Sequence, residues 1–398
     1  MIYTEKVIDV SNQGYGVCKL DGFTVFIKGA MKDEVVSFKL KNKKKKFAIG
    51  DLVSIDKASP YRKQEALIES APLFHWDYQH QLEYKNHLVE NTLNNFINEA
   101  NYHEIIGQEH PYHYRNKAQI PLLEHKGEVV LGEFIEGSNE LIPLTDLKLY
   151  DEKIIQALDV VVELMNENHM KVYNRQTRSG DFKHVVVRSS HYSNEIMIVL
   201  VASYALDLKK EFIQSLQEKL PHMTSLMLNI NKEKSSVIFG KKTKKIVGED
   251  QYMDALLDHK FLVSSQSFYQ INSEQTEKLY TEALKSLNKQ DTLLDAYCGI
   301  GTMSLIAADK VNNVIGIEIN EDAIKMANKN KIINGKDNVE FICGPVDNYL
   351  ETLEDVNTLL VDPPRAGLSK MFVDKVSASD INKMIYVSCD LMTLKRDL

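Results

Sequence analysis

The sequence has few cysteines and no long hydrophobic run. Its four cysteines, Cys18, Cys298, Cys343 and Cys389, lie far apart and form no CxxC pair. This spacing argues against a metal or iron–sulfur site built from neighbouring cysteines and against a disulfide framework. The longest strongly apolar run, at 196–202, is far shorter than the roughly 20 residues of a membrane-spanning helix. The chain also starts without the layout of a secretory signal, so we expect a cytoplasmic protein that does not bind membranes.

The formal net charge of −8 is unevenly distributed along the chain. Residues 1–63 carry 13 Lys and Arg residues against 7 Asp and Glu residues, whereas the remainder carries 35 against 49. The basic excess centres on KLKNKKKKF at 39–47. Such a run is typical either of a solvated hairpin tip or of a surface that binds nucleic-acid phosphates. Lys43, Lys44 and Lys45 are therefore candidate RNA contacts.

A chain of 398 residues divides on size alone into two or three domains. In residues 1–57, short apolar stretches alternate with glycine turns, which predicts a small OB-like β-barrel. The run from Gly14 to Gly16, followed by GFTVFIKGAMKDEVV, resembles the TRAM domain of RNA-modifying enzymes.

Residues 58–262 predict an α+β domain. Helical apolar spacing indicates helices within 77–100 and 152–170, and β-branched runs indicate strands at 182–190 and 195–203. The polar turn and strand of YRNKAQIPL at 114–122 offer Arg115 and Lys117 as candidate phosphate contacts, although an ordinary loop is the better explanation of these residues by themselves. The basic run KKTKK at 241–245 is a further candidate.

From residue 263 to 398 strands and helices alternate, which predicts a parallel, doubly wound Rossmann-like α/β sheet. Gly299 and Gly301 lie between the strand DTLLDAY and a helix, and Glu318 ends the next strand. A carboxylate in that position can bind a ribose diol. Because the third glycine of a GxGxxG motif is missing, this loop favours S-adenosyl-L-methionine over a nicotinamide dinucleotide.

Two further side chains are expected at the same carboxyl edge of the sheet. Asp362 ends the strand TLLVD and precedes Pro363 and Pro364, which restrict the backbone at this position. A simple strand-ending turn is the alternative. Cys389 is predicted to end the strand KMIYVSC, next to the strand of Asp362. A thiolate there can add to C6 of uracil and so activate C5 for methylation.

The motifs SFYQIN, DAYCGIGT, DPPRAGL and VSCDLMTLKRD occur in the order found in RNA uracil-5-methyltransferases, and the chain resembles that family. The resemblance implies that Cys389 is the nucleophile and that Asp362 is also catalytic. It further implies that Gln270, Tyr297, Glu318 and Asp362 line the pocket for S-adenosyl-L-methionine and uracil. YRNKAQIP and GDFKHVVVR resemble central-domain signatures of the family. Because members with a TRAM domain are similar to the 23S ribosomal RNA enzymes, the implied product is 5-methyluridine in 23S rRNA, with transfer RNA as the alternative.

Two departures from the family give further expectations. The segments at 69–85 and 141–150 lack the cysteines that hold an iron–sulfur cluster in many relatives, so we expect no cluster and no other metal. The family continues to a glutamate base beyond the point corresponding to Leu398, so either the sequence is truncated or another group acts as the base. We expect this chain to form a covalent adduct and release product slowly. An RNA-binding protein with impaired turnover and a small-molecule methyltransferase or dehydrogenase are the other hypotheses. We favour a monomer.

Overall fold

The computed structural model describes residues 1–65, 67–97, 102–349 and 356–398. The chain forms two compact units, and both are discontinuous in sequence. Unit 1 consists of Met1–Gly107 and Gly132–Leu147, and unit 2 of Gln108–Leu131 and Lys148–Leu398. The division into domains at 1–57, 58–262 and 263–398 stays a prediction.

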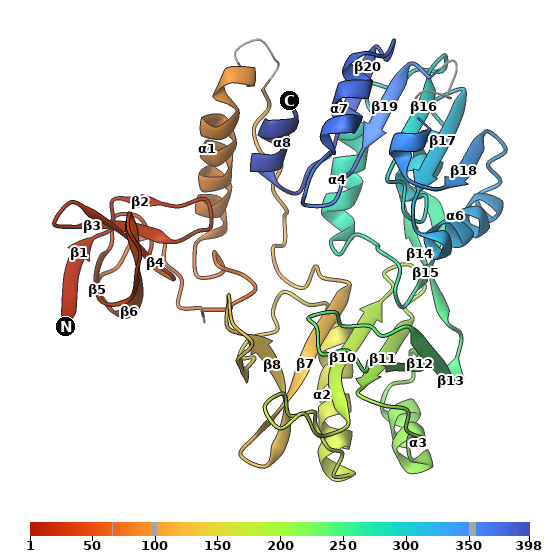
Figure 1. The fold of residues 1–398 in the computed structure, drawn as a ribbon. Coiled ribbons are helices and arrows are strands. Elements are labelled where there is room, and N and C mark those ends of the chain that lie inside the picture. The colour runs from red at the N-terminus through yellow and green to blue at the C-terminus, as the bar shows by residue number, and fades with distance from the viewer. Residues whose placement is uncertain (66, 98–101, 350–355) are drawn as a thin grey trace. The chain divides into compact units, whose positions relative to one another are not determined.

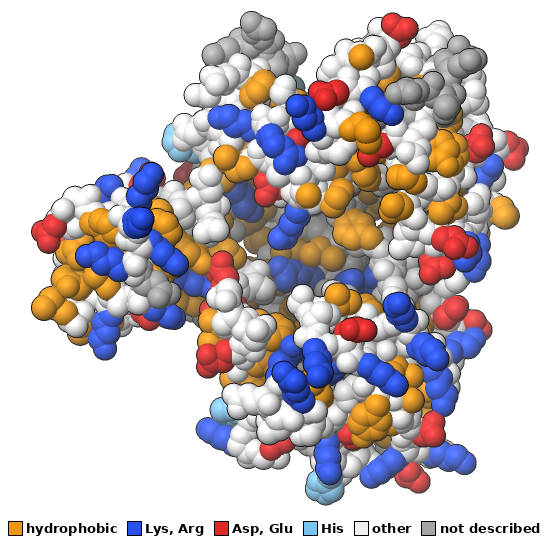
Figure 2. Space-filling view, viewed as in Figure 1, with side chains coloured by type: hydrophobic (Ala, Val, Ile, Leu, Met, Phe, Trp, Pro, Cys, Tyr) orange, Lys and Arg blue, Asp and Glu red, His pale blue; other side chains and the backbone are white. Residues whose placement is uncertain are grey.

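Unit 1 contains a rolled six-stranded sheet (Figure 1). Its strand order is β1-β5-β6-β4-β3-β2, and it encloses a small apolar core that includes Val25, Phe38 and Ala48. The strands are β1 Ile2–Lys6, β2 Asp9–Val10, β3 Gly16–Leu20, β4 Phe23–Ile27, β5 Val35–Lys43 and β6 Phe47–Lys57. The lysine run covers the end of β5 and the turn to β6, as the hairpin interpretation predicts, and Figure 2 shows Lys and Arg side chains on the barrel.

The long helix of unit 1 is α1, Tyr78–Ile97. It begins after Asp77, whose carboxylate accepts a hydrogen bond from Gln79 N at 3.0 Å, the arrangement of an N-terminal cap. The predicted helix over 77–100 is confirmed as far as Ile97, and residues 98–100 lie outside the described part of the chain.

The central sheet has the strand order β13-β12-β11-β10-β7-β8-β9. Its strands are antiparallel except for the parallel pair β11 and β12. The division between the two units falls within β8. The helices that accompany this sheet are α2 Glu152–Glu167 and α3 Lys210–Lys219. The strands are β7 Lys117–His125, β8 Glu128–Phe134, β9 Leu141–Pro143, β10 Phe182–Ser189, β11 Ile196–Ala202, β12 Met223–Ile230 and β13 Lys242–Gly248.

A two-stranded hairpin, β14 Gln251–Leu256 with β15 His259–Ser264, follows the central sheet. Sequence patterns did not reveal it. Its buried residues Tyr252 and Phe261 belong to one apolar cluster with Val199 of the central sheet and Leu305 of the last part of the chain. This shared core explains why residues 148–398 form one compact unit.

The last part of unit 2 is a five-stranded parallel sheet with the order β18-β17-β16-β19-β20, which confirms the predicted α/β sheet. Its strands are β16 Thr292–Ala296, β17 Asn313–Glu318, β18 Val339–Cys343, β19 Thr358–Val361 and β20 Lys383–Tyr386. The helices are α4 Ser273–Ala283, α5 Thr302–Ala307, α6 Glu321–Ile333, α7 Lys370–Ser377 and α8 Leu391–Asp397. The chain crosses from one side of β16 to the other between β18 and β19, which creates a ligand-binding crevice at the carboxyl ends of the strands.

The prediction that Cys389 ends a strand is wrong in detail. β20 ends at Tyr386, and Cys389 lies in the following turn with an exposed side chain. The strand stops because Ser388 Oγ bonds to the backbone of Asp390, accepting from its N–H at 3.2 Å and donating to its carbonyl at 2.9 Å. Such local bonds compete with a sheet ladder. Among the described residues, no helix has the length and hydropathy to cross a membrane.

Candidate active site

The glycine loop connects β16 to α5 through backbone conformations that favour glycine. Gly299 and Gly301 have φ values of 57° and 81°. A Cβ atom on Gly301 would lie 2.6 Å from Cζ of Phe341, whereas a Cβ atom on Gly299 would meet no protein atom within 4 Å. Gly301 is therefore required for packing, and Gly299 leaves the backbone open to a ligand.

Glu318 ends β17 beside this loop. Its Oε2 accepts a hydrogen bond from Gly299 N at 3.2 Å, and its Oε1 accepts one from Asn320 N at 2.9 Å. Each carboxylate oxygen has a second lone pair, so the group can still accept hydrogen bonds from a diol. The structure thus brings together the glycine loop and the predicted ribose-binding carboxylate.

A small cavity of about 70 Å³ lies beside the glycine loop. It is lined by four of the predicted site residues, Gln270, Tyr297, Gly299 and Asp362. The other lining residues are Phe268, Tyr269, Tyr280, Asp295, Cys298, Ile300, Thr302 and Met303. A second cavity of about 610 Å³ contains Glu318 and shares Phe268, Gly299 and Ile300 with the first. The shared residues make the two cavities neighbours.

Two carboxyl groups of the small cavity hold protons more tightly than usual. Burial raises the pKa of Asp295 to about 7, with Ser304 Oγ donating a hydrogen bond that acts in the opposite direction. Burial also raises the pKa of Asp362 to about 6. Groups that titrate near neutral pH inside a cavity are common in catalytic sites.

Tyr280 on α4 is a lining residue that sequence reasoning missed. Its hydroxyl lies 3.2 Å from Oγ1 of Thr302, the first residue of α5. Burial raises the pKa of this hydroxyl to about 12, so it stays protonated and can donate a hydrogen bond. Only the apolar spacing of α4 pointed toward its burial, and nothing local indicated its polar contact.

The loop that carries Phe268 and Gln270 is held by the two central-domain motifs. Asn116, fully buried, donates from Nδ2 to the carbonyl of Gln270 at 2.9 Å and to Ser273 Oγ at 3.2 Å. Arg188, 1% exposed, donates to the carbonyls of Ser265 and Ser267. The motifs YRNKAQIP and GDFKHVVVR therefore hold the loop that contains Gln270 through hydrogen bonds from Asn116 and Arg188.

The two aromatic residues of this loop differ sharply. Phe268 is 72% exposed, whereas Tyr269 is 4% exposed and belongs to the hydrophobic core. Tyr269 therefore packs in the core, and Phe268 lines both cavities with an exposed side chain.

Cys389 is not among the residues that line either cavity. Its turn follows β20, which pairs in parallel with β19, so the turn lies at the same sheet edge as Asp362. Val387 N donates a hydrogen bond to the carbonyl of Val361 at 2.8 Å, which connects the start of the Cys389 turn to the residue before Asp362. The nucleophilic role of Cys389 stays a prediction.

The five candidate RNA-binding residues fall into two environments. Lys43, Lys44 and Lys45 are exposed at the hairpin tip of unit 1. In unit 2, Lys117 is partly buried opposite Arg188, and burial followed by the charge of Arg188 lowers its pKa to about 7. Arg115 lies within 6 Å of two tyrosine rings, at 5.9 Å from Tyr114 and 5.5 Å from Tyr150. The exposed lysines suit phosphate binding better than these two partly buried groups.

Residues 77–398 match the family described as tRNA (Uracil-5-)-methyltransferase. The chain belongs to this family. The resemblance to the RNA uracil-5-methyltransferases is thereby confirmed.

Relatives within the family extend the similarity over the whole chain. An uncharacterized RNA methyltransferase of Oceanobacillus iheyensis is 35% identical over 410 residues, covering 100% of this chain and 89% of that protein. One of Staphylococcus epidermidis is 34% identical over 412 residues, covering 100% and 90%. Both match the N-terminal unit as well as the residues recognised by the family.

A solved structure shares the fold. The tRNA (uracil-54, C5)-methyltransferase of Pyrococcus abyssi, in complex with S-adenosyl-L-homocysteine, superposes with a TM-score of 0.82 at 24% identity. The match covers 99% of this chain and 92% of that one. An α/β methyltransferase fold follows for this member of the family.

Proposed function

We propose that this protein methylates C5 of a uridine in 23S ribosomal RNA with S-adenosyl-L-methionine as the methyl donor. The observation that carries the proposal is the small cavity in which the glycine loop, Gln270 and Asp362 meet. Family membership supports the reaction type.

The residues at the sheet edge fit the proposed donor. The open backbone at Gly299 gives room for a ligand, and Glu318 can accept hydrogen bonds from ribose hydroxyls. The complex of the Pyrococcus abyssi enzyme with S-adenosyl-L-homocysteine supports the same choice. The donor would supply an electrophilic methyl group.

Cys389 and Asp362 would act on the uracil. The Cys389 thiolate forms a bond to C6, and the electron pair of the C5–C6 double bond moves toward C5 and O4. C5 would then take the methyl group as the bond from that group to the donor sulfur breaks, which leaves S-adenosyl-L-homocysteine. A base would remove the C5 proton, and the C6–S bond would break to return the thiolate. Asp362, with a pKa raised by burial to about 6, is ionised at neutral pH and can accept a hydrogen bond from uracil N3–H.

Transfer RNA is the second candidate substrate. The description of the family and that of the Pyrococcus abyssi enzyme both name tRNA. The TRAM-like N-terminal pattern favours the ribosomal substrate. A base inside a folded RNA must in either case be unstacked before the site can reach it.

The test uses labelled donor with separate 23S rRNA and tRNA transcripts. We expect 5-methyluridine in the 23S transcript, mapped by mass spectrometry of nucleosides. Cys389→Ala should abolish both product and the covalent complex with RNA that contains 5-fluorouridine, because no thiolate can reach C6. Cys343→Ser, which alters the other exposed cysteine, is the matched control and should retain both. Methylation of tRNA alone would show that tRNA is the substrate. Formation of product by the Cys389→Ala variant would refute the role of Cys389 as the nucleophile.

A further inference from the structure

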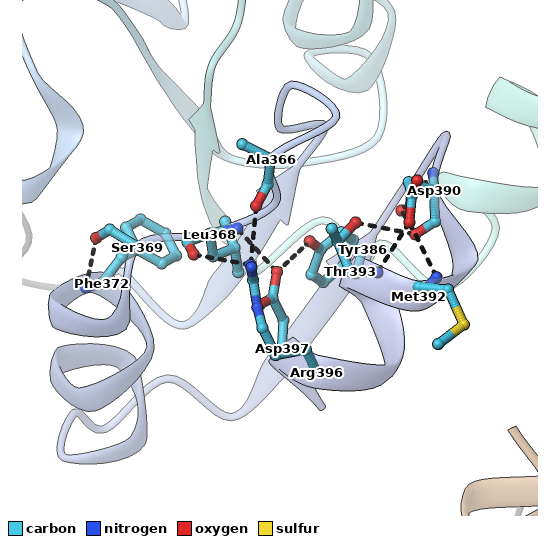
Figure 3. Close-up of polar contacts among 11 residues, drawn as sticks. Ala366, Leu368, Ser369, Phe372, Tyr386, Asp390, Met392, Thr393, Arg396 and Asp397 are labelled. Carbon is cyan, nitrogen blue, oxygen red and sulfur yellow. Dashed lines mark hydrogen bonds and ion pairs between the residues drawn. The ribbon is translucent and has the colours of Figure 1, made fainter. Parts of the chain in front are cut away.

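The turn that carries Cys389 leads into α8, a helix with no buried apolar residue, although the side chain of Asp397 is only 2% exposed. Apolar burial is the dominant force that holds helices in place, and α8 has little of it. Polar contacts at its two ends hold this helix instead (Figure 3). The position of Cys389 therefore depends on these contacts.

At the start of α8, Asp390 caps the helix. Its Oδ1 accepts hydrogen bonds from Met392 N at 3.0 Å and Thr393 N at 2.9 Å. Thr393 Oγ1 donates in return to the carbonyl of Asp390 at 3.0 Å. These contacts fix the direction in which the chain leaves the cysteine turn, but they join no other element.

At the end of α8, Asp397 joins three elements. Its Oδ2 accepts hydrogen bonds from Leu368 N at 2.8 Å, in the loop after Asp362, and from Tyr386 Oη at 2.7 Å, at the end of β20. Its side chain is 2% exposed, and Oδ1 pairs with Arg396 at 2.7 Å. Burial raises the pKa of Asp397, but the hydrogen bonds from Leu368, Tyr386 and Arg396 outweigh it and lower the pKa. The group is a buried, fully paired carboxylate.

Arg396 and Gly367 complete this contact. Arg396 donates from Nη2 to the carbonyls of Ala366 at 2.9 Å and Leu368 at 3.2 Å. A Cβ atom on Gly367 would lie 2.5 Å from Oδ2 of Asp397 and 2.6 Å from Nη2 of Arg396. A larger residue would displace the side chains of Asp397 and Arg396 from this contact, and the positive φ of 73° at Gly367 would strain it as well.

We propose that Asp397 is a positioning residue that sets the distance between the Cys389 turn and the Asp362 turn. It does so because one carboxylate binds the loop after Asp362, the end of β20 and the end of α8. The inference rests on the proposed function, since it assigns both turns to one reaction. A misplacement of about 1 Å between reacting groups can lower a rate about 100-fold.

The experiment compares Asp397→Asn and Gly367→Ala with Asp380→Asn, a change on an exposed aspartate just before β20. We expect both test variants to lower the rate of covalent adduct formation with RNA that contains 5-fluorouridine by about 100-fold. The dissociation constant of S-adenosyl-L-methionine, measured by calorimetry, should not change, because Glu318 and the glycine loop are untouched. An unchanged rate of adduct formation, or a loss of donor affinity in proportion to that rate, would overturn the proposal.

A second measurement separates this proposal from the proposed function. In a Cys343→Ser background Cys389 is the one exposed cysteine of the described residues, so a thiol reagent reports on its turn without RNA. We expect Asp397→Asn to label several times faster than wild type and Asp380→Asn to label at the wild-type rate. Equal rates in all three would refute the positioning role, whereas a wild-type protein that methylates no RNA would refute only the proposed function.

Discussion

Asp295 and Asp362 are acidic residues whose surroundings oppose their ionisation. Asp295 is 3% exposed, at the end of a buried strand, and its pKa is raised by burial to about 7. Asp362 lines the same cavity, and each negative charge disfavours another nearby. Asp295 thus keeps its proton up to a pH of about 7, and loss of that proton lowers the free energy of unfolding.

Asp295→Asn should change how stability depends on pH. A carboxyl group whose pKa is raised in the folded state favours folding below its ordinary pKa of 3.8, and this advantage is lost as the pH rises toward about 7. The free energy of unfolding of wild type relative to the variant should therefore fall by about 1.4 kcal/mol per pH unit across that window. Urea denaturation between pH 4 and pH 8 measures it, with Asp380→Asn as the control. Parallel curves for wild type and Asp295→Asn would contradict the raised pKa.

At the scale of elements, the loop between β15 and α4 owes its shape to residues far away in the sequence. Asn116 and Gln270 are separated by 154 positions, yet the amide of one binds the carbonyl of the other. Arg188 binds the same loop from β10. Buried polar contacts of this kind favour one loop conformation over others.

Asn116→Ala should weaken donor binding and stability together. The substitution removes the side-chain donor from the partly buried carbonyl of Gln270, which costs about 0.5–1.5 kcal/mol of unfolding free energy. We expect a higher dissociation constant for S-adenosyl-L-methionine by calorimetry, because Gln270 lines the cavity. Asn288→Ala removes an exposed amide contact to the carbonyl of Ser286 at 3.4 Å and should change neither quantity. A stable variant with unaltered donor binding would show that the loop keeps its shape without Asn116.

The parallel sheet and the glycine loop were predictable because their signals are local. Apolar runs such as TLLDA and NVIGIE followed by glycine or a carboxylate mark strand ends regardless of what surrounds them. The roles of Asn116, Arg188 and Tyr280 were not predictable, since each depends on a partner brought close only by folding. The end of β20 was misplaced for a smaller reason, because Ser388 and Asp390 form a local turn inside an apolar run.

At the scale of the whole molecule, positive charge is concentrated in residues 1–63 while the rest of the chain is acidic. The hairpin tip with Lys43, Lys44 and Lys45 lies in unit 1, and the candidate catalytic residues lie in unit 2. The proposed function therefore assigns the attraction of RNA to unit 1 and the chemistry on RNA to unit 2.

Replacing Lys43, Lys44 and Lys45 by alanine should weaken RNA binding in a salt-dependent way. Each lost phosphate contact lowers the slope of log affinity against log salt by about 0.7–0.9. Filter binding across a salt series measures this slope, and kcat at saturating RNA should be unchanged. Lys126, Lys209 and Lys210, also exposed, form the matched triple replacement. An identical slope for the two triple variants would assign RNA binding to other residues.

The discontinuity of the two units affects the order in which they can fold during synthesis. Unit 1 requires nothing beyond Leu147, so all of its residues have been translated before α2 begins to form. The segment Gln108–Leu131 by contrast belongs to unit 2 and must wait for β10, its neighbour in the sheet, which follows only at Phe182. While the ribosome adds the intervening residues, β7 has an unpaired edge on a nascent chain whose first unit is already complete.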